Sequence, residues 1–278
     1  MEIVTAPVAV ARRPRAFVRV WGPQATDYLN RMVSNDVVGV GAGRSCDALL
    51  LTPKARVVAT LRVVRRAEDD YLLLTEPELG AIVRDHLLRT RFAAKTEIEL
   101  EQHDSHLLFG LTAEGEDEAL VVPNSDYGMP AAEVIGRPPP QGLPELDEDT
   151  LERMRIEAGT PRFGREIDER VLPAEAGLEE RAISFTKGCY PGQEPVARLH
   201  FRGHPNRALR VLRIESEAVP EPDTEILYAG KSVGRVTSAA LAGGGVIALG
   251  YVRVEVPLGV ELKVGDARAT MAAPRARS

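Results

Sequence analysis

The sequence predicts an α+β fold of antiparallel sheets with helices on one face, followed by a small C-terminal β-barrel. Strand and helix patterns interleave over the first part of the chain, but without the regular alternation of a parallel doubly wound sheet. From residue 207 onward only short strands remain, separated by Gly and Pro turns. About five such strands in roughly 65 residues indicate a closed or nearly closed barrel.

The N-terminal elements follow from hydrophobic periodicity. Residues 14–21 alternate polar and apolar side chains, which predicts a half-buried strand, and Gly22-Pro23 then opens a helix. That helix has one apolar face with i, i+3, i+4, i+7, i+8 spacing: Ala25, Tyr28, Leu29, Met32 and Val33. The turn Ser34-Asn35-Asp36 ends it. Further strands are predicted at 47–51, 56–64, 71–74, 97–100 and 107–111, and a second amphipathic helix at 79–87.

The remaining chain divides into a middle segment and the barrel. Residues 138–142 (Pro-Pro-Pro-Gln-Gly) predict a stiff surface connector, and a helix over 150–158 ends at Gly159. Barrel strands are predicted at 207–214, 226–228, 232–238, 246–256 and 261–271, with a hairpin tip at 242–245. We therefore expect domains at 1–140, 141–206 and 207–278.

Composition narrows the class of protein. The chain has 278 residues, 44% hydrophobic and 27% charged, as in an ordinary globular protein. A net charge of −6 argues against broad electrostatic nucleic-acid binding. Two cysteines are too few for a disulfide scaffold or a CxxC metal site. No secretory signal or membrane-length apolar stretch is visible, so we expect a cytoplasmic protein with reduced thiols.

Several other features have ordinary structural interpretations. Glycines at 39, 41 and 43 match no phosphate-loop motif and indicate a turn. His200 and His204 flank Gly203, so a helical zinc pair is disfavoured and loop histidines are expected. Cys46 is expected to be a packing residue, and the acidic run 114–118 a hairpin tip. We expect no metal site.

The segment 187–194, Lys-Gly-Cys-Tyr-Pro-Gly-Gln-Glu, is where chemistry is most visible. It is hydrophilic and rich in turn formers, so Cys189 is expected in an exposed loop. Lys187 would favour the thiolate if the two side chains approach. The alternative is a structural loop in which Gln193 and Glu194 only bind neighbouring backbone groups.

The same segment, followed by Ala197-Arg198-Leu199, strongly resembles the signature of the YgfZ family. These are folate-binding relatives of the glycine-cleavage T-protein, implicated in iron–sulfur cluster maintenance. Weaker matches follow in the expected order along the chain, at 34–37, 50–54, 155–164, 173–178, 234–238 and 248–252.

The resemblance implies a ring-like T-protein fold with tetrahydrofolate in a central channel, and iron–sulfur client or assembly proteins as partners. It implies a role for Cys189 as a redox-active, cluster-contacting or one-carbon-accepting thiol, with Lys187 tuning it and Tyr190 at the pocket mouth. The expected folate-site residues are Asn35, Glu133, Arg155, Gln193, Glu194 and Arg198, of which Gln193 shapes the mouth and Glu194 and Arg198 hold the loop.

One departure from the T-protein matters. Its hairpin strand carries a pair of aspartates, one of them catalytic in aminomethyl transfer, but the equivalent residues 56–61 here contain no carboxylate. Leu151 also stands where a pterin-binding arginine is expected. We therefore favour an accessory protein for iron–sulfur enzymes. The alternatives are a folate-dependent aminomethyl or methyl transferase or demethylating enzyme, and a partner-docking scaffold.

Overall fold

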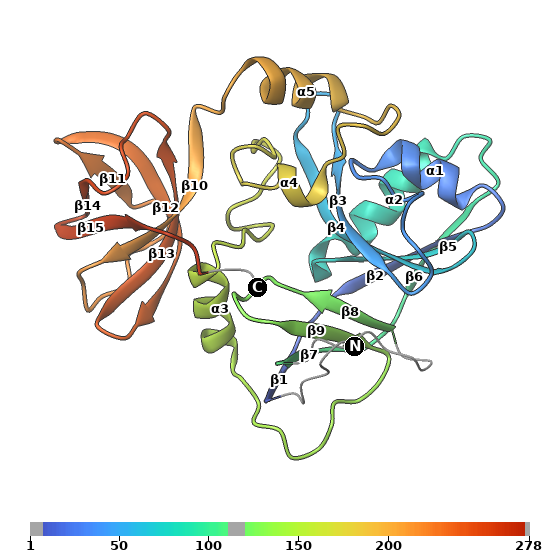
Figure 1. Ribbon diagram of the computed structural model, residues 1–278, viewed down its shortest axis with the longest axis horizontal. Coiled ribbons are helices and arrows are strands. Elements are labelled where there is room, and N and C mark those ends of the chain that lie inside the picture. Colours follow the sequence, from blue (N-terminus) through green and yellow to red (C-terminus); the bar gives the residue numbers. More distant parts are fainter. Residues whose placement is uncertain (1–7, 111–119, 276–278) are drawn as a thin grey trace.

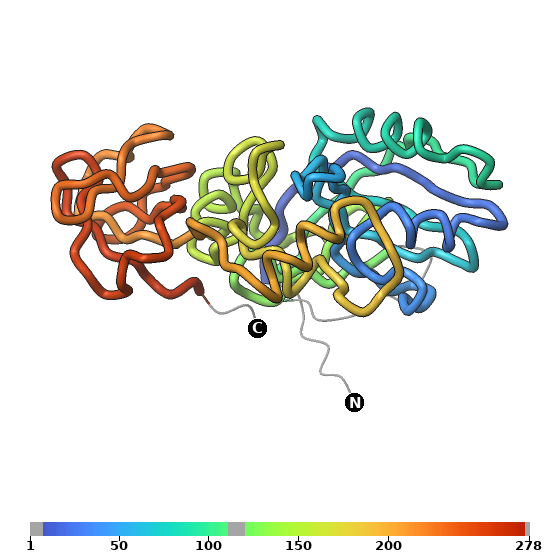
Figure 2. The backbone as a smooth tube through the Cα atoms, turned by 90° about the horizontal axis from the view of Figure 1, so that it is seen from above, coloured from blue at the N-terminus to red at the C-terminus, as the bar shows by residue number. Residues whose placement is uncertain are grey.

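Two antiparallel sheets and a closed barrel organise the computed structural model, which describes residues 8–110 and 120–275 (Figure 1). This confirms the α+β fold and the C-terminal barrel. The barrel lies at one end of the molecule and the N-terminal sheets at the other, with the middle segment between them (Figure 2). No helix in the described ranges is long and apolar enough to cross a membrane. The three domain boundaries stay a prediction.

The first sheet holds the larger N-terminal core. Its strand order is β3-β4-β5-β2-β6, and its strands are β2 (Ala16–Trp21), β3 (Ser45–Leu51), β4 (Val57–Ala67), β5 (Asp70–Thr75) and β6 (Glu97–Glu101). Helices α1 (Ala25–Met32) and α2 (Gly80–Thr90) contribute to its core, and η1 (Pro77–Leu79) leads into α2. The predicted apolar face of α1 is buried against this sheet, which confirms the helical periodicity.

The second sheet was only partly predicted. Its order is β1-β7-β9-β8, with β1 (Ala9–Arg12), β7 (Ser105–Phe109), β8 (Leu120–Asn124) and β9 (Ala131–Ile135). The sequence indicated β7 alone, because β1, β8 and β9 have four or five residues and little alternation. The acidic run 114–118 and Leu111 lie outside the described residues.

Helix α3 (Glu148–Glu157) connects the sheets to the barrel. Asp147 caps it by accepting the backbone N–H of Thr150 at 2.8 Å, and Gly159 follows it with φ of +66°. The barrel order is β10-β13-β12-β11-β14-β15. Its strands are β10 (Arg207–Ile214), β11 (Glu225–Tyr228), β12 (Lys231–Ala242), β13 (Gly245–Arg253), β14 (Glu261–Val264) and β15 (Ala267–Ala272).

Two predictions need correction. Residues 261–271 form two strands and not one, because Gly265 adopts φ of +59° and turns the chain between β14 and β15. Residues after 192 are helical: α5 (Gln193–Arg202) follows the short α4 (Glu179–Ala182), so His200 lies on a helix and not in a loop. Only Val196 of α5 is buried, which left almost no apolar periodicity to detect.

Candidate functional site

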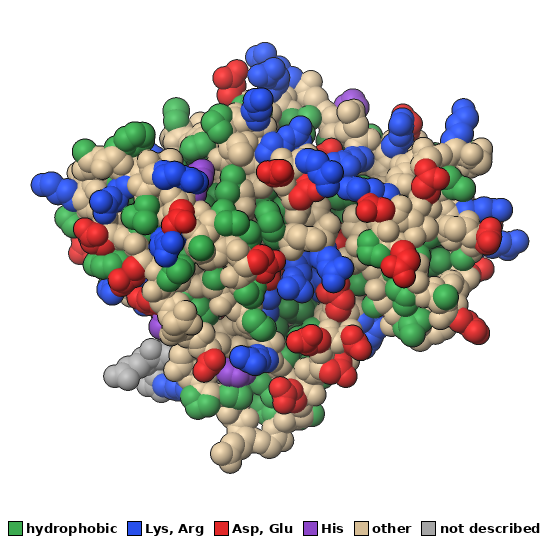
Figure 3. All heavy atoms as spheres, turned by 180° about the vertical axis from the view of Figure 1, so that it is seen from behind, with side chains coloured by type: hydrophobic (Ala, Val, Ile, Leu, Met, Phe, Trp, Pro, Cys, Tyr) green, Lys and Arg blue, Asp and Glu red, His purple; other side chains and the backbone are tan. Residues whose placement is uncertain are grey.

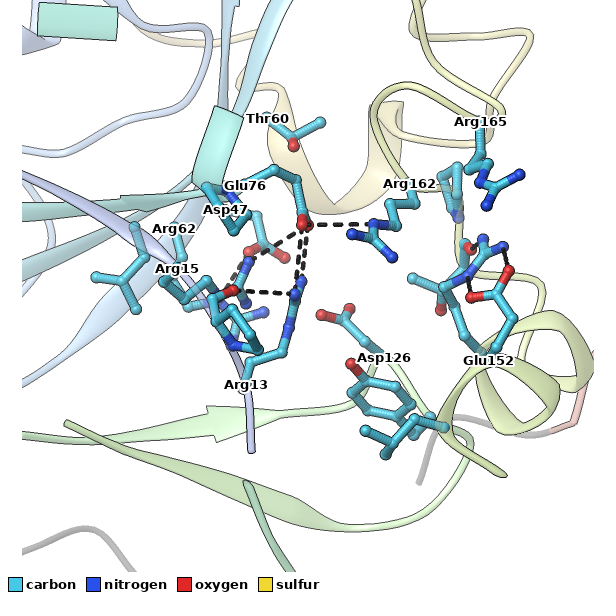
Figure 4. Close-up of a pocket in the computed structure, with 18 of the residues that line it drawn as sticks. Arg13, Arg15, Asp47, Thr60, Arg62, Glu76, Asp126, Glu152, Arg162 and Arg165 are labelled. Atoms are coloured by element: carbon cyan, nitrogen blue, oxygen red, sulfur yellow. Dashed lines mark hydrogen bonds and ion pairs between the residues drawn. The ribbon is translucent and has the colours of Figure 1, made fainter. Parts of the chain in front are cut away.

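A cavity of about 870 Å³ lies between the two N-terminal sheets, the start of α3 and the segment 160–182 (Figure 4). The chain brings residues from many distant segments to its wall. Charged side chains predominate: Arg12, Arg13, Arg15, Asp47, Arg62, Glu76, Asp126, Glu145, Asp147, Glu148, Asp149, Glu152, Arg155, Arg162, Arg165 and Arg181.

Three guanidiniums converge on Glu76, which follows the apolar strand β5. Arg13 Nη2 lies 2.7 Å from Glu76 Oε1, Arg15 Nη1 lies 3.7 Å from the same oxygen, and Arg162 Nε lies 3.5 Å from Oε2. Figure 4 shows Arg162 reaching toward Glu76 from the opposite wall. Burial opposes ionisation of Glu76, but the neighbouring arginines outweigh it and hold its carboxyl pKa below the usual range.

A second ionic group joins β3, α4 and the turn before β9. Asp47 accepts Arg62 Nε at 3.0 Å and Arg181 Nε at 2.7 Å, and Asp126 Oδ1 accepts Arg181 Nη2 at 2.9 Å. Asp126 Oδ2 has only a 3.4 Å contact with the Asn124 amide. Burial opposes ionisation, yet the charge of Arg181 and its neighbours lowers the pKa of Asp126. This carboxylate therefore keeps acceptor capacity that faces the cavity.

The cavity also has an apolar wall. Tyr127 is nearly buried, and its ring meets Phe109 edge-on at 5.7 Å. The apolar side chains that line the space with it are Pro14, Ala48, Leu49, Leu61, Leu74, Pro77, Leu146, Leu151, Pro161, Leu178 and Ala182. A flat, partly aromatic ligand with a few polar groups fits such a lining.

Of the expected folate-site residues, only Arg155 lines this cavity. Its five N–H donors are already used: Nε and Nη2 bind Glu152, Nη1 binds Thr160 O and Glu166, and Nη2 also binds Ser238. A bound molecule could therefore take its hydrogen bonds only by displacing a protein group.

Glu133 and Asn35 lie outside the cavity wall. Glu133 is fully buried on β9 and accepts Arg15 Nε and Nη2, each at 2.9 Å. Asn35 donates to the backbone carbonyls of Asp47 and Arg181. Glu133 thus positions Arg15, and Asn35 positions the backbone of Asp47 and Arg181, all of which line the cavity. The roles of Glu133 and Asn35 in folate binding stay predictions.

The cysteine loop runs outside the cavity. Cys189 is exposed and free, and it is not among the residues that line the cavity. Lys187 Nζ donates to Val33 O and Asn35 O at 2.7 Å each. Desolvation lowers the pKa of Lys187 to about 8. The ammonium is thus held by the turn after α1, and the contacts of the described residues include none between Lys187 and Cys189.

The other side chains of this loop make contacts within the protein that fix its conformation. Tyr190 is buried, its ring lies 5.4 Å from Lys187 Nζ, and burial raises its pKa to about 12. Gln193 Nε2 reaches Lys187 O at 3.5 Å, and Arg198 lies 3.5 Å from Glu194, both largely exposed. None of these side chains reaches the cavity wall, so their roles toward folate stay predictions.

The segment 56–61, where the resemblance predicts that the T-protein aspartates are missing, presents no carboxylate to the cavity. Strand β4 presents Thr60, Leu61 and Arg62 to the cavity. Among the acids that line it, Asp47, Glu76 and Asp126 make the ion pairs described above, and they were not singled out from the sequence. A usable signal exists for two of them, since Asp47 and Glu76 each border a run of buried apolar residues.

The remaining candidates from the sequence concern metal binding and Cys46. Within the described residues no group of His, Cys, Asp and Glu is arranged to hold a metal ion. Cys46 is partly exposed and packs against the N-terminal core, and burial raises its pKa to about 12. A thiol with that pKa stays protonated at neutral pH, as expected of a packing residue.

Comparisons with known proteins agree with this architecture. Residues 206–276 match the family model described as CAF17, C-terminal beta-barrel domain. The chain is 27% identical to tRNA-modifying protein YgfZ of Edwardsiella ictaluri, covering 90% of this chain and 85% of that protein. It is 26% identical to an aminomethyltransferase of Moorella thermoacetica, covering 81% and 72%.

Among solved structures, the chain resembles the glycine cleavage system aminomethyltransferase T from Bartonella henselae. The TM-score is 0.83 at 17% identity, over 98% of this chain and 87% of the other. At this identity the likeness establishes the fold.

Proposed function

Because the chain belongs to a YgfZ-like family and has the T-protein fold, we propose that it binds tetrahydrofolate in the central cavity. In this proposal it serves as an accessory protein for the assembly or repair of iron–sulfur enzymes and does not transfer aminomethyl groups.

The observation that carries folate binding is the combination of size and lining. A space of about 870 Å³ lies within the usual range for small-molecule sites. The pyrimidine edge of a pterin presents adjacent N–H groups, and a carboxylate can accept both. Asp126 is the best-suited carboxylate, because one of its oxygens has only a weak protein contact and Tyr127 lies next to it in the cavity wall.

Calorimetry with 5-formyltetrahydrofolate, a stable derivative, tests this assignment. Loss of a charge-assisted bond to the pterin predicts that Asp126→Asn weakens binding by about 10- to 100-fold. Asp223→Asn is the matched control, since Asp223 is a 70% exposed barrel residue. Absence of measurable binding by the unaltered protein would remove the proposal.

Aminomethyl transfer is disfavoured by the state of the available acids. The general base of such a reaction needs a pKa near the working pH, whereas Asp126 is held below its ordinary pKa and Asp47 is bound by two arginines. We expect no turnover of an aminomethylated carrier protein. Formation of methylene-tetrahydrofolate in that assay would restore the transferase alternative.

Cys189 supports the accessory role through its position. The thiol is exposed and lies outside the cavity wall, so a second protein can reach it while folate is bound. In a deletion strain we expect wild type, but not Cys189→Ser, to restore iron–sulfur enzyme activity. Because relatives are named tRNA-modifying proteins, tRNA modification is a second readout. Full rescue by Cys189→Ser would contradict the thiol role.

Chemical modification of Cys189 separates this role from pure docking, with folate affinity as the control for folding. Cys189→Ser should bind 5-formyltetrahydrofolate as tightly as wild type, because the side chain does not line the cavity. The docking scaffold would be favoured if Cys189→Ser lost a partner that co-purifies with wild type, while mass spectrometry of wild type detected no oxidised or modified Cys189.

A further inference from the structure

We propose that the exposed face of α5 is the docking surface for the second protein that reaches Cys189, with Phe201 as its apolar centre. The partner surface that fits this face has carboxylates around a pocket for an aromatic ring. This inference rests on the accessory role proposed above, and it adds where the second protein binds and through which chemistry.

Phe201 is a large apolar side chain that the fold leaves in solvent. It is 68% exposed on α5, whereas Val196 of the same helix is buried. Its ring is nevertheless held in place, because it meets the rings of Phe185 and His200 edge-on at 5.7 Å and 4.8 Å. Those two rings stack on each other at 3.9 Å. An aromatic ring that is fixed before binding loses little conformational entropy when a partner covers it, as suits an interface anchor.

The charged side chains beside Phe201 form one row along the helix. Glu194, Arg198 and Arg202 follow one another at four-residue spacing, so they lie on the same face of α5. Arg198 lies 3.5 Å from Glu194, but both side chains are largely exposed, and such a pair contributes little. In Figure 3, basic side chains gather at the top of the molecule, the end at which Figure 1 shows α5.

This mixture of groups fits a protein better than a nucleic acid. A nucleic-acid site faces a continuous row of phosphates and is basic throughout, whereas the 89% exposed Glu194 would repel phosphates at one end of the row. Protein interfaces combine an aromatic centre with a polar rim, and arginine is enriched in them. Arg198 and Arg202 in the rim favour a partner that places carboxylates opposite them.

One partner can cover both Phe201 and the thiol. The cysteine loop joins Phe185, which contacts the Phe201 ring, to the start of α5. Cys189 follows Phe185 by four positions, which limits the distance between their Cα atoms to about 14 Å. A standard protein interface buries about 800 Å² on each partner and is wide enough for both. No residue of α5 lines the cavity, so docking here leaves the cavity wall uncovered.

Rescue of iron–sulfur enzyme activity in the deletion strain tests the apolar centre. Phe201→Asp should lower the rescued activity by about 10-fold or more, since loss of an aromatic anchor typically weakens binding by about 30-fold. Leu258→Asp is the matched control, because Leu258 is a 75% exposed apolar residue before β14, and it should rescue like wild type. Both variants should keep the wild-type melting temperature and affinity for 5-formyltetrahydrofolate, because neither side chain is buried or lines the cavity.

Charge reversal in the same assay tests the chemistry of the partner. Arg198 is 68% exposed and lies 3.5 Å from Glu194, and Arg253 on the barrel is 61% exposed and lies 3.4 Å from Glu255. The two arginines are therefore closely matched in exposure and pairing. Arg198→Glu should lower rescue several-fold, because it would face the carboxylates of the partner, and Arg253→Glu should rescue like wild type.

Photo-crosslinking in this strain identifies the class of partner. The variant Phe201→p-benzoylphenylalanine keeps an aromatic ring at the centre of the surface and reacts with whatever covers it under light. Mass spectrometry should find a peptide of another protein joined to residue 201. The yield of this adduct should fall when Arg198→Glu is added and stay unchanged with Arg253→Glu.

The outcomes separate this inference from the proposed function. Full rescue by Phe201→Asp, together with lost rescue by Cys189→Ser, overturns the docking surface and leaves the thiol role in place. Equal effects of Arg198→Glu and Arg253→Glu overturn the acidic partner, and so does a nucleotide adduct or no adduct at residue 201. Full rescue by Cys189→Ser removes the thiol role and this inference together.

Discussion

The hydroxyl of Tyr190 is buried and has no hydrogen-bond partner among the described residues. An unsatisfied buried hydroxyl costs about 1–3 kcal/mol. Tyr190→Phe should therefore leave the free energy of unfolding unchanged or raise it by about 1 kcal/mol. Tyr251→Phe is the control, because Tyr251 Oη donates to Glu166 O at 2.9 Å, and its loss should destabilise by about 1 kcal/mol. Urea unfolding measures both.

Asp126 gives the protein a specific acid sensitivity. Its pKa is lowered in the folded protein from the ordinary 3.8, so its ionisation stabilises the fold above that pH. This contribution is lost as the pH falls below about 4, where the unfolded chain binds the proton first. The stability difference between wild type and Asp126→Asn should be constant from pH 7 to 5 and shrink below 4. Urea unfolding at each pH measures this difference, and a difference that stays constant down to pH 2.5 would contradict the assignment. The control Asp223→Asn should differ little from wild type in stability at any pH.

The cysteine loop approaches the β3–β4 hairpin most closely at Gly192, where the two backbones are in contact. Gly192 has φ of +83°, and a Cβ there would lie 2.6 Å from Thr52 O. Gly192→Ala should therefore destabilise the protein by about 2–4 kcal/mol, or shift the loop and abolish rescue in the deletion strain. Gly188→Ala is the control in the same loop, since a Cβ there meets nothing within 4 Å. Thermal unfolding should separate the two variants, and equal melting temperatures would contradict the docking contact.

The elements that sequence could predict are those that bury a whole face. Helix α1 and strands β2 to β5 pack on a large core, so a period of 3.6 or 2 was visible. Helix α5 begins after Gly192, contains Pro195 and buries only Val196, so turn signals hid it. The exposed position of Cys189 was predicted correctly, because turn formers surround it.

The cavity itself could not be predicted, because tertiary structure assembles it. Glu76, Asp126 and Arg162 come from three distant segments, and nothing local in the sequence pairs them. Arg155 shows the reverse problem: a residue recognised by resemblance lies in the wall, but its donors are used within the protein. Ion-pair assignments need the fold, since they depend on which long side chains meet.

At the scale of the whole molecule, the cavity and the cysteine loop are separate sites. The cavity lies between the N-terminal sheets and the middle segment, whereas the cysteine loop packs against the β3–β4 hairpin at Gly192 and does not line the cavity. The loop and the cavity nevertheless share β3, because Asn35, beside the Lys187 anchor, also donates to Asp47 O. The turn after α1 therefore contacts both the Lys187 side chain and a strand that lines the cavity.

Arg155 joins the middle segment to the barrel, and its removal should loosen the whole molecule. Its guanidinium on α3 binds the fully buried Glu166 and the barrel residue Ser238, and Glu166 also accepts Ser238 Oγ and Thr237 Oγ1. Arg155→Leu leaves the Glu166 carboxylate buried without its charge partner, a change that typically costs about 3–5 kcal/mol.

Arg153→Leu on the same helix is the matched control, because Arg153 is 37% exposed and its pair with Glu157 should contribute less than about 1 kcal/mol. Urea unfolding followed by Trp21 fluorescence and by far-UV circular dichroism should give one shared transition for wild type and Arg153→Leu. For Arg155→Leu, the two transitions should separate, because Trp21 reports the N-terminal sheet while the barrel loses its anchor. Coincident transitions with a stability loss below 1 kcal/mol would show that the barrel is held by its apolar contacts alone, such as those of Ile156 with Val211 and Leu249.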